Sequence, residues 1–262
     1  AYKKSRVYGL HFDIGVFLNI AADHISPVEH PSFEDYLYCK SQLMINSSKV
    51  IINRECPYYD LLAQKALAAG NQVISFGSSQ STADYRYVVD SPHEFHVATF
   101  SSQQPQLTGR FKINIPGTFN DSNALAALVV GRQFSDDTAA FVKGLEETTV
   151  PGRMEMLSNQ RGLLACVDYA HNYLSLNESF KYMKNTYPNG RLLVVIGAAG
   201  GKAESRRKDI GEALAKYADV AILTSEDNFF EDPHQIDEEI KSHIDNPNVE
   251  VHINVDRAKA IQ

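Results

Sequence analysis

The first 150 residues show two different hydrophobic patterns. Short apolar runs first alternate with segments whose apolar positions recur at helical spacing, which is typical of alternating α/β structure with a parallel sheet. The apolar positions then recur at every second residue, which predicts a small antiparallel meander between residues 84 and 115. The predicted elements are strand 15–20, helix 33–45, strand 49–53, helix 58–69, strand 72–76, the meander, and helices 119–134 and 135–147.

After Val150, Pro151 and Gly152 the alternation of apolar runs and helical segments begins again. Strands are predicted at 163–167, 192–196, 220–223 and 249–253, with helices at 174–185, 204–217 and 233–244 between them. Short connections of this kind favour a doubly wound sheet, in which ligands gather at the carboxyl ends of the strands. We therefore predict an α/β chain of two domains, residues 1–149 and 150–262.

Composition narrows the class of protein. The 262 residues include 25 Lys and Arg against 32 Asp and Glu, a net charge of −7, with 44% hydrophobic residues, as in ordinary globular proteins. Cys39, Cys56 and Cys166 are too few and too widely spaced for a disulfide framework, so a reducing, cytoplasmic setting is expected. Apolar runs fall well short of the ~20 residues that span a bilayer. Basic residues gather only at 202–208, so neither a membrane nor nucleic acid is an expected partner.

A glycine-rich segment follows the strand predicted at 192–196. Gly197, Gly200, Gly201 and Lys202 invite comparison with a phosphate-binding loop. The spacing is one residue short, however, and no hydroxyl residue follows the lysine to reach a magnesium ion. We predict a flexible strand-to-helix turn at the carboxyl edge of the sheet, which can still face a ligand.

Two polar sites in the first half of the chain could carry chemistry. Asp23 and His24 follow the strand at 15–20, where short polar side chains can contact a metal ion or a phosphate, although capping of the next turn is an alternative. Lys40 lies on the helix at 33–45 among aromatic residues that could shield its amine. A desolvated lysine loses its charge and becomes reactive. A lysine that extends into solvent is the ordinary alternative.

Side chains in the middle of the chain suit a nucleotide. Asn120 and Asn123, one turn apart at a predicted helix start, offer the donors and acceptors that a purine edge requires, although helix capping uses the same residue type. Arg153, next to Gly152, is a permanent cation for an anionic ligand or for an interdomain salt bridge.

Asp168 and His171 follow the strand predicted at 163–167. The carboxylate of Asp168 can accept hydrogen bonds from ribose hydroxyls, or it can stand at a helix N-terminus. His171 could act as a general base, but no serine or cysteine lies at a spacing that suits a nucleophilic triad. Triad chemistry is therefore not predicted.

In this order along the chain, these segments together resemble the Mur ligase family. The resemblance covers nearly the whole chain and is greatest to the branch that adds the third residue of the peptidoglycan stem peptide. It implies the remnant of a central ATPase domain followed by a Rossmann-like C-terminal domain. The matching segments are Arg6 to Gly9, Phe17 to Ile20 with Asp23 and His24, Phe33 to Tyr36 with Lys40, Phe119 and Asn120 with Asn123, Pro151 to Glu155, Val167 to His171, Glu204 to Asp209, and Glu231 to Pro233.

The resemblance implies an ATP-dependent amide ligase of peptidoglycan biosynthesis. Its substrates would be ATP, UDP-N-acetylmuramoyl-L-alanyl-D-glutamate and an amino acid, with L-lysine preferred. The D-glutamyl carboxylate would attack the γ-phosphate to give an acyl phosphate, which the incoming amine captures. Mg²⁺ would neutralise the crowded phosphate oxygens as charge moves.

The resemblance also implies roles for single residues that bind the metal ion and the nucleotide. These residues are His24 and a carbamylated Lys40 for Mg²⁺, Asn120 and Asn123 for adenine, Arg153 for the nucleotide phosphates, and Asp168 for the ribose, with His171 beside it.

The other substrates would be bound by residues from both halves of the chain. Arg6 matches a residue that holds the UDP-muramoyl dipeptide, and Lys202 falls where a basic group receives the carboxylate of the incoming amino acid. Glu226 and Asp227 fall on the loop that selects this amino acid, and Arg207 is expected among the substrate-binding residues.

We expect the chain to be part of a longer enzyme and to be inactive alone, because the family's UDP-binding domain and phosphate loop have no counterpart in it. Two alternatives stay open. One is a ligase similar to folylpolyglutamate synthetase, which adds glutamate to folate. The other is a non-catalytic nucleotide-binding paralogue that retains the fold.

Overall fold

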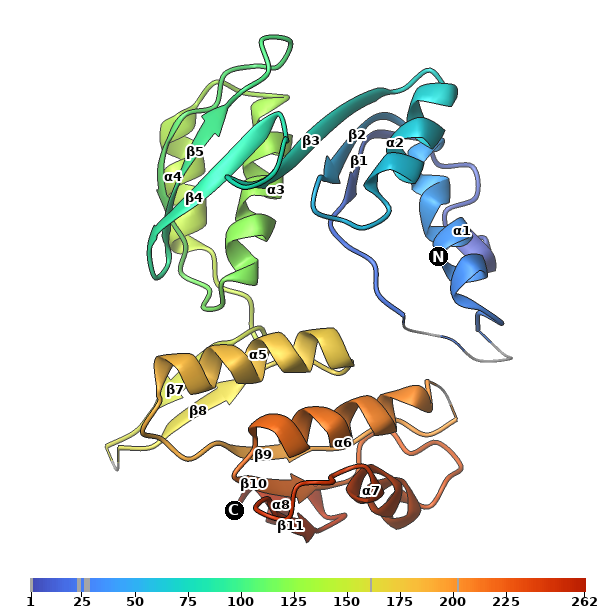
Figure 1. Ribbon diagram of the computed structural model, residues 1–262, viewed down its shortest axis with the longest axis vertical. Coiled ribbons are helices and arrows are strands. Elements are labelled where there is room, and N and C mark those ends of the chain that lie inside the picture. Colours follow the sequence, from blue (N-terminus) through green and yellow to red (C-terminus); the bar gives the residue numbers. More distant parts are fainter. Residues whose placement is uncertain (1, 23–24, 26–28, 161, 202) are drawn as a thin grey trace. The chain divides into compact units, whose positions relative to one another are not determined.

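The computed structural model describes all residues of the chain except 1, 23–24, 26–28, 161 and 202 (Figure 1). It divides into two compact units. The first comprises Ala1–Ile20 and Leu37–Val167, and the second comprises Ala21–Tyr36 and Asp168–Gln262. The domain boundary predicted near residue 150 stays a prediction.

The first unit is built on one six-stranded sheet that joins the predicted α/β part and the predicted meander. Strands β1 to β4 pair in parallel in chain order, and β5 and β6 continue the sheet antiparallel (Figure 1). The strands are β1 (Phe12–Phe17), β2 (Ser47–Asn53), β3 (Gln72–Ser78), β4 (Tyr85–Ser91), β5 (Glu94–Thr99) and β6 (Gly109–Lys112).

Helices cover both faces of this sheet because successive side chains of a strand point to opposite sides. Ile51 of β2 packs into a core with α3, whereas its neighbours Val50 and Ile52 pack into a second core with α2. The helices of the unit are α2 (Tyr59–Ala68), α3 (Phe119–Arg132) and α4 (Thr138–Glu147), with 3₁₀ turns at Tyr2–Lys4 and Gln42–Met44. Helix α1 (Phe33–Ser41) begins in the second unit and enters the first at Leu37.

The last two strands of this unit, β7 (Glu155–Ser158) and β8 (Leu164–Val167), form an antiparallel pair. The sequence pattern had placed residues 163–167 in the doubly wound sheet of the second half. A local interaction explains the difference, since the side chain of Asn159 accepts a hydrogen bond from the backbone N–H of Leu163, at 3.1 Å. This contact helps to close a hairpin, and β8 pairs with its sequence neighbour β7.

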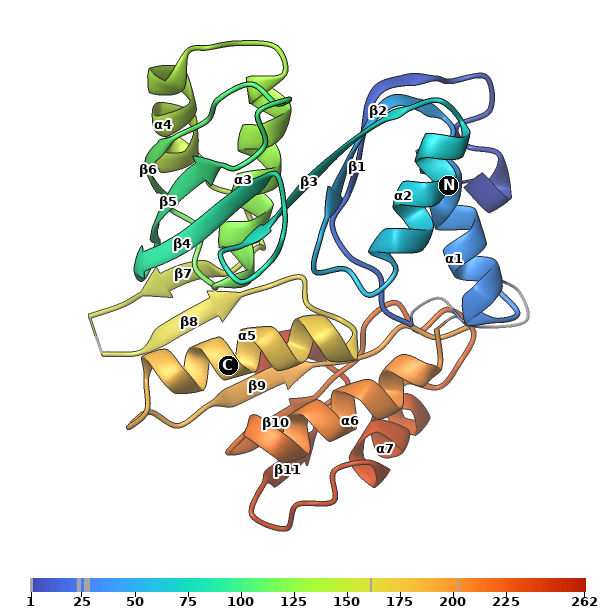
Figure 2. The same ribbon diagram turned by 45° about the horizontal axis from the view of Figure 1, so that its top comes forward.

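The second unit contains a parallel sheet of three strands in the order β11, β10, β9 (Figure 2). Its core lies between these strands and helices α5, α6 and α7. The elements are α5 (Tyr173–Thr186), β9 (Leu193–Ile196), α6 (Ser205–Tyr217), β10 (Val220–Leu223), α7 (Pro233–Ser242), β11 (Glu250–Ile253) and α8 (Arg257–Ile261). The predicted α/β class is confirmed. Among the described residues, no helix is long and apolar enough to cross a bilayer.

Candidate functional site

Lys40 lies in the last turn of α1, and its side chain is exposed. The expected shielding by aromatic neighbours is therefore wrong. The ring of Tyr36 is buried and lies edge-on to that of His30, at a centroid distance of 5.0 Å. Tyr38 is 64% exposed, and the amine over its ring belongs to Lys65 of α2, at 4.9 Å. His24, the other residue expected to bind Mg²⁺, lies outside the described residues.

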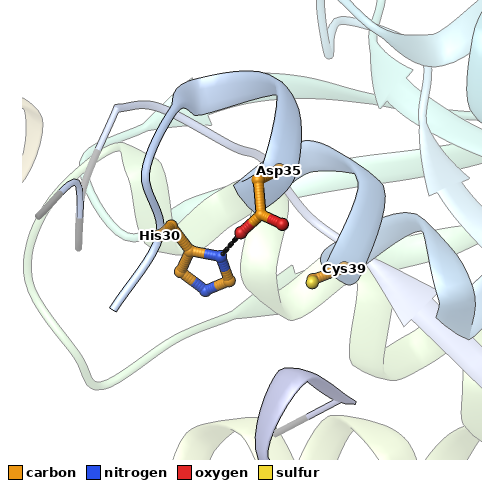
Figure 3. Close-up of side chains that lie close together, drawn as sticks. All are labelled: His30, Asp35 and Cys39. Atoms are coloured by element: carbon orange, nitrogen blue, oxygen red, sulfur yellow. Dashed lines mark hydrogen bonds and ion pairs between the residues drawn. The ribbon is translucent and has the colours of Figure 1, made fainter. Parts of the chain in front are cut away.

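A polar cluster that the sequence analysis missed lies along α1 and the residues before it (Figure 3). His30 Nδ1 and Asp35 Oδ2 are 2.6 Å apart, and Cys39 follows Asp35 by one helical turn. One donor atom from each of the three half-buried side chains lies within 4.8 Å of the others. Imidazole, carboxylate and thiolate groups can coordinate divalent cations. The sequence offered one signal for this cluster: His30 lies five residues before Asp35, an acidic residue of the first turn of α1.

The start of α3 places two amide side chains in a fixed relation. Asn120 Nδ2 donates to the carbonyl oxygen of Pro116 at 2.6 Å, and its Oδ1 accepts from Asn123 Nδ2 at 3.0 Å. Asn123 is exposed, whereas Asn120 is half-buried. Both lie inside the helix, whose N-cap is Thr118. N-capping does not explain them, and the hydrogen bond to Asn120 instead fixes the orientation of the exposed Asn123 side chain.

Arg153 is exposed in the turn that follows Val150, and the backbone N–H of Gly152 next to it donates to Glu155 Oε2 at 2.9 Å. Gly152 has a φ of +71°, a conformation that glycine adopts without strain. The turn is thus held by its own backbone and one carboxylate. Arg6, expected to bind the dipeptide substrate, is exposed just after the turn at Tyr2–Lys4.

In the second unit, Asp168 comes directly after β8, and its Oδ1 accepts from the backbone N–H of Ala170 at 2.7 Å. His171 Nδ1 lies 2.7 Å from the carbonyl oxygen of Tyr169. The N-cap of α5 is Asn172, so Asp168 is not the cap of that helix. Asp168 and His171 therefore follow a strand, as predicted, and the structure adds that each makes a local hydrogen bond in the segment between β8 and α5.

The loops that follow β9 and β10 are joined to each other. The backbone N–H of Gly200 donates to the carbonyl oxygen of Asp227 at 2.9 Å. A side chain at Gly200 would overlap the carbonyl oxygen of Asn228, so the approach requires glycine. The predicted strand-to-helix turn is confirmed. Lys202 lies outside the described residues, and the side chains of Glu226 and Asp227 are exposed on the opposite loop.

Arg207 is buried in the first turns of α6, with only 5% of its surface exposed. Its Nη1 lies 2.6 Å from Glu239 Oε2, and its Nη2 lies 2.7 Å from Glu231 Oε2. Glu231 also accepts from the backbone N–H of Gly201, and this bond, together with Arg207, lowers its pKa. The guanidinium therefore faces protein carboxylates.

Comparison with known proteins identifies the fold. Residues 1–131 match the Mur ligase middle domain, and residues 152–262 match the Mur ligase glutamate ligase domain. The chain is 42% identical over its whole length to the UDP-N-acetylmuramoyl-L-alanyl-D-glutamate--L-lysine ligase of Enterococcus faecalis, of which it covers 52%. The chain thus spans about half the length of the curated relatives it matches.

Solved structures agree with this assignment. A UDP-N-acetylmuramoyl-L-alanyl-D-glutamate--2,6-diaminopimelate ligase matches 99% of the chain over 53% of its own length, with a TM-score of 0.59 and 28% identity. Folylpolyglutamate synthase of Mycobacterium tuberculosis matches 95% of the chain over 55% of its own length, with a TM-score of 0.74 and 18% identity, which shows a shared fold. By the two domain matches and the described architecture, the chain belongs to the Mur ligase family.

Proposed function

We propose that the chain is part of an ATP-dependent ligase that adds L-lysine to UDP-N-acetylmuramoyl-L-alanyl-D-glutamate in peptidoglycan biosynthesis. The observation that carries this proposal is the 42% identity to the L-lysine ligase of Enterococcus faecalis over the whole chain. The exposed carboxylates of Glu226 and Asp227 support it, because a loop with two negative charges suits the ammonium group of a lysine side chain.

The proposed reaction has two steps. A D-glutamyl carboxylate oxygen bonds to the γ-phosphorus of ATP while the bond to the bridging oxygen breaks, which gives an acyl phosphate and ADP. The amine of the amino acid then attacks the acyl carbon, loses a proton and displaces phosphate. The products are the amide, ADP and inorganic phosphate, so the atoms balance without any other reactant.

Four residues are assigned to the nucleotide. We assign Asn123, oriented by Asn120, to adenine, and Arg153 to the phosphates. Asp168 would accept from the ribose hydroxyls, with His171 in the same turn. Arg6 would hold the dipeptide substrate, and Lys202 the carboxylate of the amino acid.

The metal ion would be held by His24 and Lys40. Lys40 is exposed at the end of α1, so carbon dioxide can reach its amine, and the resulting carbamate supplies the oxygen donors that Mg²⁺ prefers. Bound there, Mg²⁺ would neutralise charge on the phosphate oxygens. The chain's own residues position the nucleotide and the carboxylate for the transfer.

The full-length protein tests this proposal. With ATP, Mg²⁺ and UDP-N-acetylmuramoyl-L-alanyl-D-glutamate, we expect phosphate release that depends on added lysine. Release with glutamate and a folate instead would assign the protein to the folylpolyglutamate branch, whose fold it shares. A protein that binds ATP but releases no phosphate with either set of substrates would be a non-catalytic paralogue.

The role of Lys40 has its own test in the same assay. We expect Lys40→Ala to lose most of the phosphate release, and Lys143→Ala, which changes an exposed lysine of α4, to retain it. Added bicarbonate should raise the activity of the parent protein and leave Lys40→Ala unchanged. An undiminished rate in Lys40→Ala would remove the carbamate from the mechanism.

A further inference from the structure

The two loops that face each other after β9 and β10 are tied to the body of the second unit through one buried cation. Arg207 reaches them from α6, and its partners lie on two different elements. Glu231 belongs to the segment that follows β10, and Glu239 belongs to α7. The guanidinium fork can bridge two carboxylates at once, which an amine cannot do with the same geometry.

Glu231 links this cation to the loop after β9, residues 197–201, which we call the glycine loop. Its Oε2 pairs with Arg207 at 2.7 Å, while its Oε1 accepts from the backbone N–H of Gly201 at 2.5 Å. Gly201 has a φ of +65°, so the glycine turns its N–H toward the carboxylate without a side-chain penalty. A single carboxylate thus joins a helix and a loop.

Backbone contacts complete the connection between the loops. Gly200 N–H donates to the carbonyl oxygen of Asp227, and Asn228 Nδ2 donates to the carbonyl oxygen of Glu231 at 2.8 Å. The first bond joins the two loops, and the second braces the loop after β10 from within, so neither comes from a helix. Arg207 adds an anchor from a helix whose own position is set by the packing of Ile210 and Leu214 in the core.

Both terminal nitrogens of Arg207 are already engaged by protein carboxylates. Nη1 and Nη2 are paired with glutamates, and Nε is buried without a hydrogen-bond partner among the described residues. A substrate carboxylate would have little access to a side chain that is 5% exposed and already neutralised by two glutamates. The geometry therefore favours a supporting role over direct contact.

We propose that Arg207 is a positioning residue: through Glu231 it holds the glycine loop against the loop of Glu226 and Asp227, and so shapes the site for the incoming amino acid without touching it. The part of this proposal that concerns the amino acid rests on the proposed function. The part that concerns the two loops does not.

Hydrogen exchange on the chain itself tests whether Arg207 holds the two loops together. In Arg207→Lys we expect faster exchange of the backbone amides at 197–201 and 226–231, and unchanged exchange in the six-stranded sheet. Glu239→Gln is the matched control, because it removes the anchor on α7 and leaves the pair with Glu231 in place. Unchanged exchange at both loops in Arg207→Lys would overturn the proposal.

The substrate part is tested by kinetics of the full-length protein. We expect Arg207→Lys to raise the KM for the amino acid roughly ten-fold or more, since it weakens a charge-assisted hydrogen bond that orders the site. The KM for ATP should stay within about two-fold of the parent value, whereas equal rises for all substrates would overturn the proposal. If the parent protein does not use lysine, the proposed function fails, and the exchange result still decides the role of Arg207.

A second variant covers the case in which Arg207→Lys does not fold, as judged by its thermal unfolding. In Glu231→Gln the amide oxygen can still accept from Gly201, but the amide nitrogen cannot pair with the guanidinium. We expect the same faster exchange at the glycine loop and the same selective rise in KM. A Glu231→Gln protein with parental loops and parental KM would contradict the proposal.

Discussion

The two units bury their cores in opposite ways. In the first unit, large aromatic side chains fill the space between sheet and helix, with Phe76, Tyr85 and Phe95 fully buried. In the second unit, small residues let elements approach closely, as at Ala213 of α6 and Ala221 of β10, which are also fully buried. Truncating a large buried side chain is expected to cost most stability in the first core. Adding atoms is expected to cost most in the second core, where small residues bring elements close together.

The contrast extends to polar groups. The residues of the first unit that we assign to adenine, Asn120 and Asn123, are neutral and are held by amide hydrogen bonds. The second unit holds its loops by the ionic contacts of Arg207 and Glu231. A neutral site tolerates changes of pH and salt, whereas a partly buried ion pair depends on the charge of both partners. The two units should therefore differ in what perturbs them.

The largest effect is expected for Phe95→Ala in the first unit. The ring of Phe95 stacks near Phe111 at a centroid distance of 5.9 Å and is fully buried, so its loss leaves a cavity. We expect the free energy of unfolding of this unit to fall by about 3–5 kcal/mol. Urea unfolding followed by hydrogen exchange would measure this loss separately for each unit.

Val89→Ala is the control for this prediction. Val89 lies in β4 of the same sheet, but its side chain is 47% exposed, so its truncation should change stability by less than about 0.5 kcal/mol. Equal losses in Phe95→Ala and Val89→Ala would contradict the view that the aromatic core carries the stability of the first unit.

The next effect concerns Asp237, a carboxylate of α7 that is 1% exposed. Neither of its oxygens has a hydrogen-bond partner among the described residues, and burial raises its pKa from 3.8 to about 6. The folded state therefore binds this proton more tightly than the unfolded state. Ionisation of Asp237 therefore lowers the free energy of unfolding as the pH rises from about 4 to about 6. The total loss is roughly 3 kcal/mol, and it stays constant above this range.

Asp237→Asn should remove this pH dependence. We expect the variant to be more stable than the parent at pH 8 and to lose that advantage at pH 4, as measured by urea unfolding at both values. Asp121 provides the comparison in the first unit, since burial also raises its pKa to about 6. Asp121 lies in the first turn of α3, where the helix dipole favours a negative charge, so Asp121→Asn should gain less. Equal gains would contradict this difference.

The sequence predicted which segments form helices and strands because that information is local. The strands at 49–53 and 220–223 lie within or coincide with β2 and β10, since apolar runs and their periodicity are written in consecutive residues. The partner of β8 was not predicted, because the apolar pattern of a strand does not say which other strand it pairs with. In the structure β8 pairs with its sequence neighbour β7, in a hairpin that the hydrogen bond to Asn159 helps to close.

The candidate site was predictable to the same extent. The start of α3, which carries Asn123, and the turn that carries Asp168 follow from residue types at the ends of elements. The shielding of Lys40 was wrong because the exposure of a side chain depends on tertiary packing, which neighbouring residue types along the chain do not determine. The pairing of Arg207 with Glu231 and Glu239 was not predictable either, since it joins residues 24 and 32 positions apart through packing of α6 and α7.

A smaller effect is expected for Gly211→Ala in α6 of the second unit. A methyl group at this position would lie 2.6 Å from the carbonyl oxygen of Ile240 and would also meet His243. The overlap opposes the gain of about 1 kcal/mol that alanine has over glycine in a helix. We expect a net loss of roughly 1–2 kcal/mol, measured by urea unfolding.

Gly144→Ala tests the same change in α4 of the first unit. A methyl group at Gly144 meets no heavy atom within 4 Å, so only the gain in helix propensity remains. Opposite signs for Gly144→Ala and Gly211→Ala would support the contrast between the two cores. Stabilisation by both substitutions would show that α6 and α7 can separate without cost.

The smallest effect concerns the first turn of α5. The side chain of Asn172 accepts from Ser175 N–H at 3.1 Å, and Ser175 Oγ accepts from Asn172 N–H, which forms a reciprocal capping box. We expect Asn172→Ala to cost about 1 kcal/mol of unfolding free energy in the second unit. Asn172→Asp keeps the acceptor and should retain most of the stability.

In the first unit, Asp137 caps α4 by accepting from Ala140, without the reciprocal bond, so Asp137→Ala should cost less than Asn172→Ala. A larger loss for Asp137→Ala would mean that the reciprocal bond does not strengthen the cap of α5.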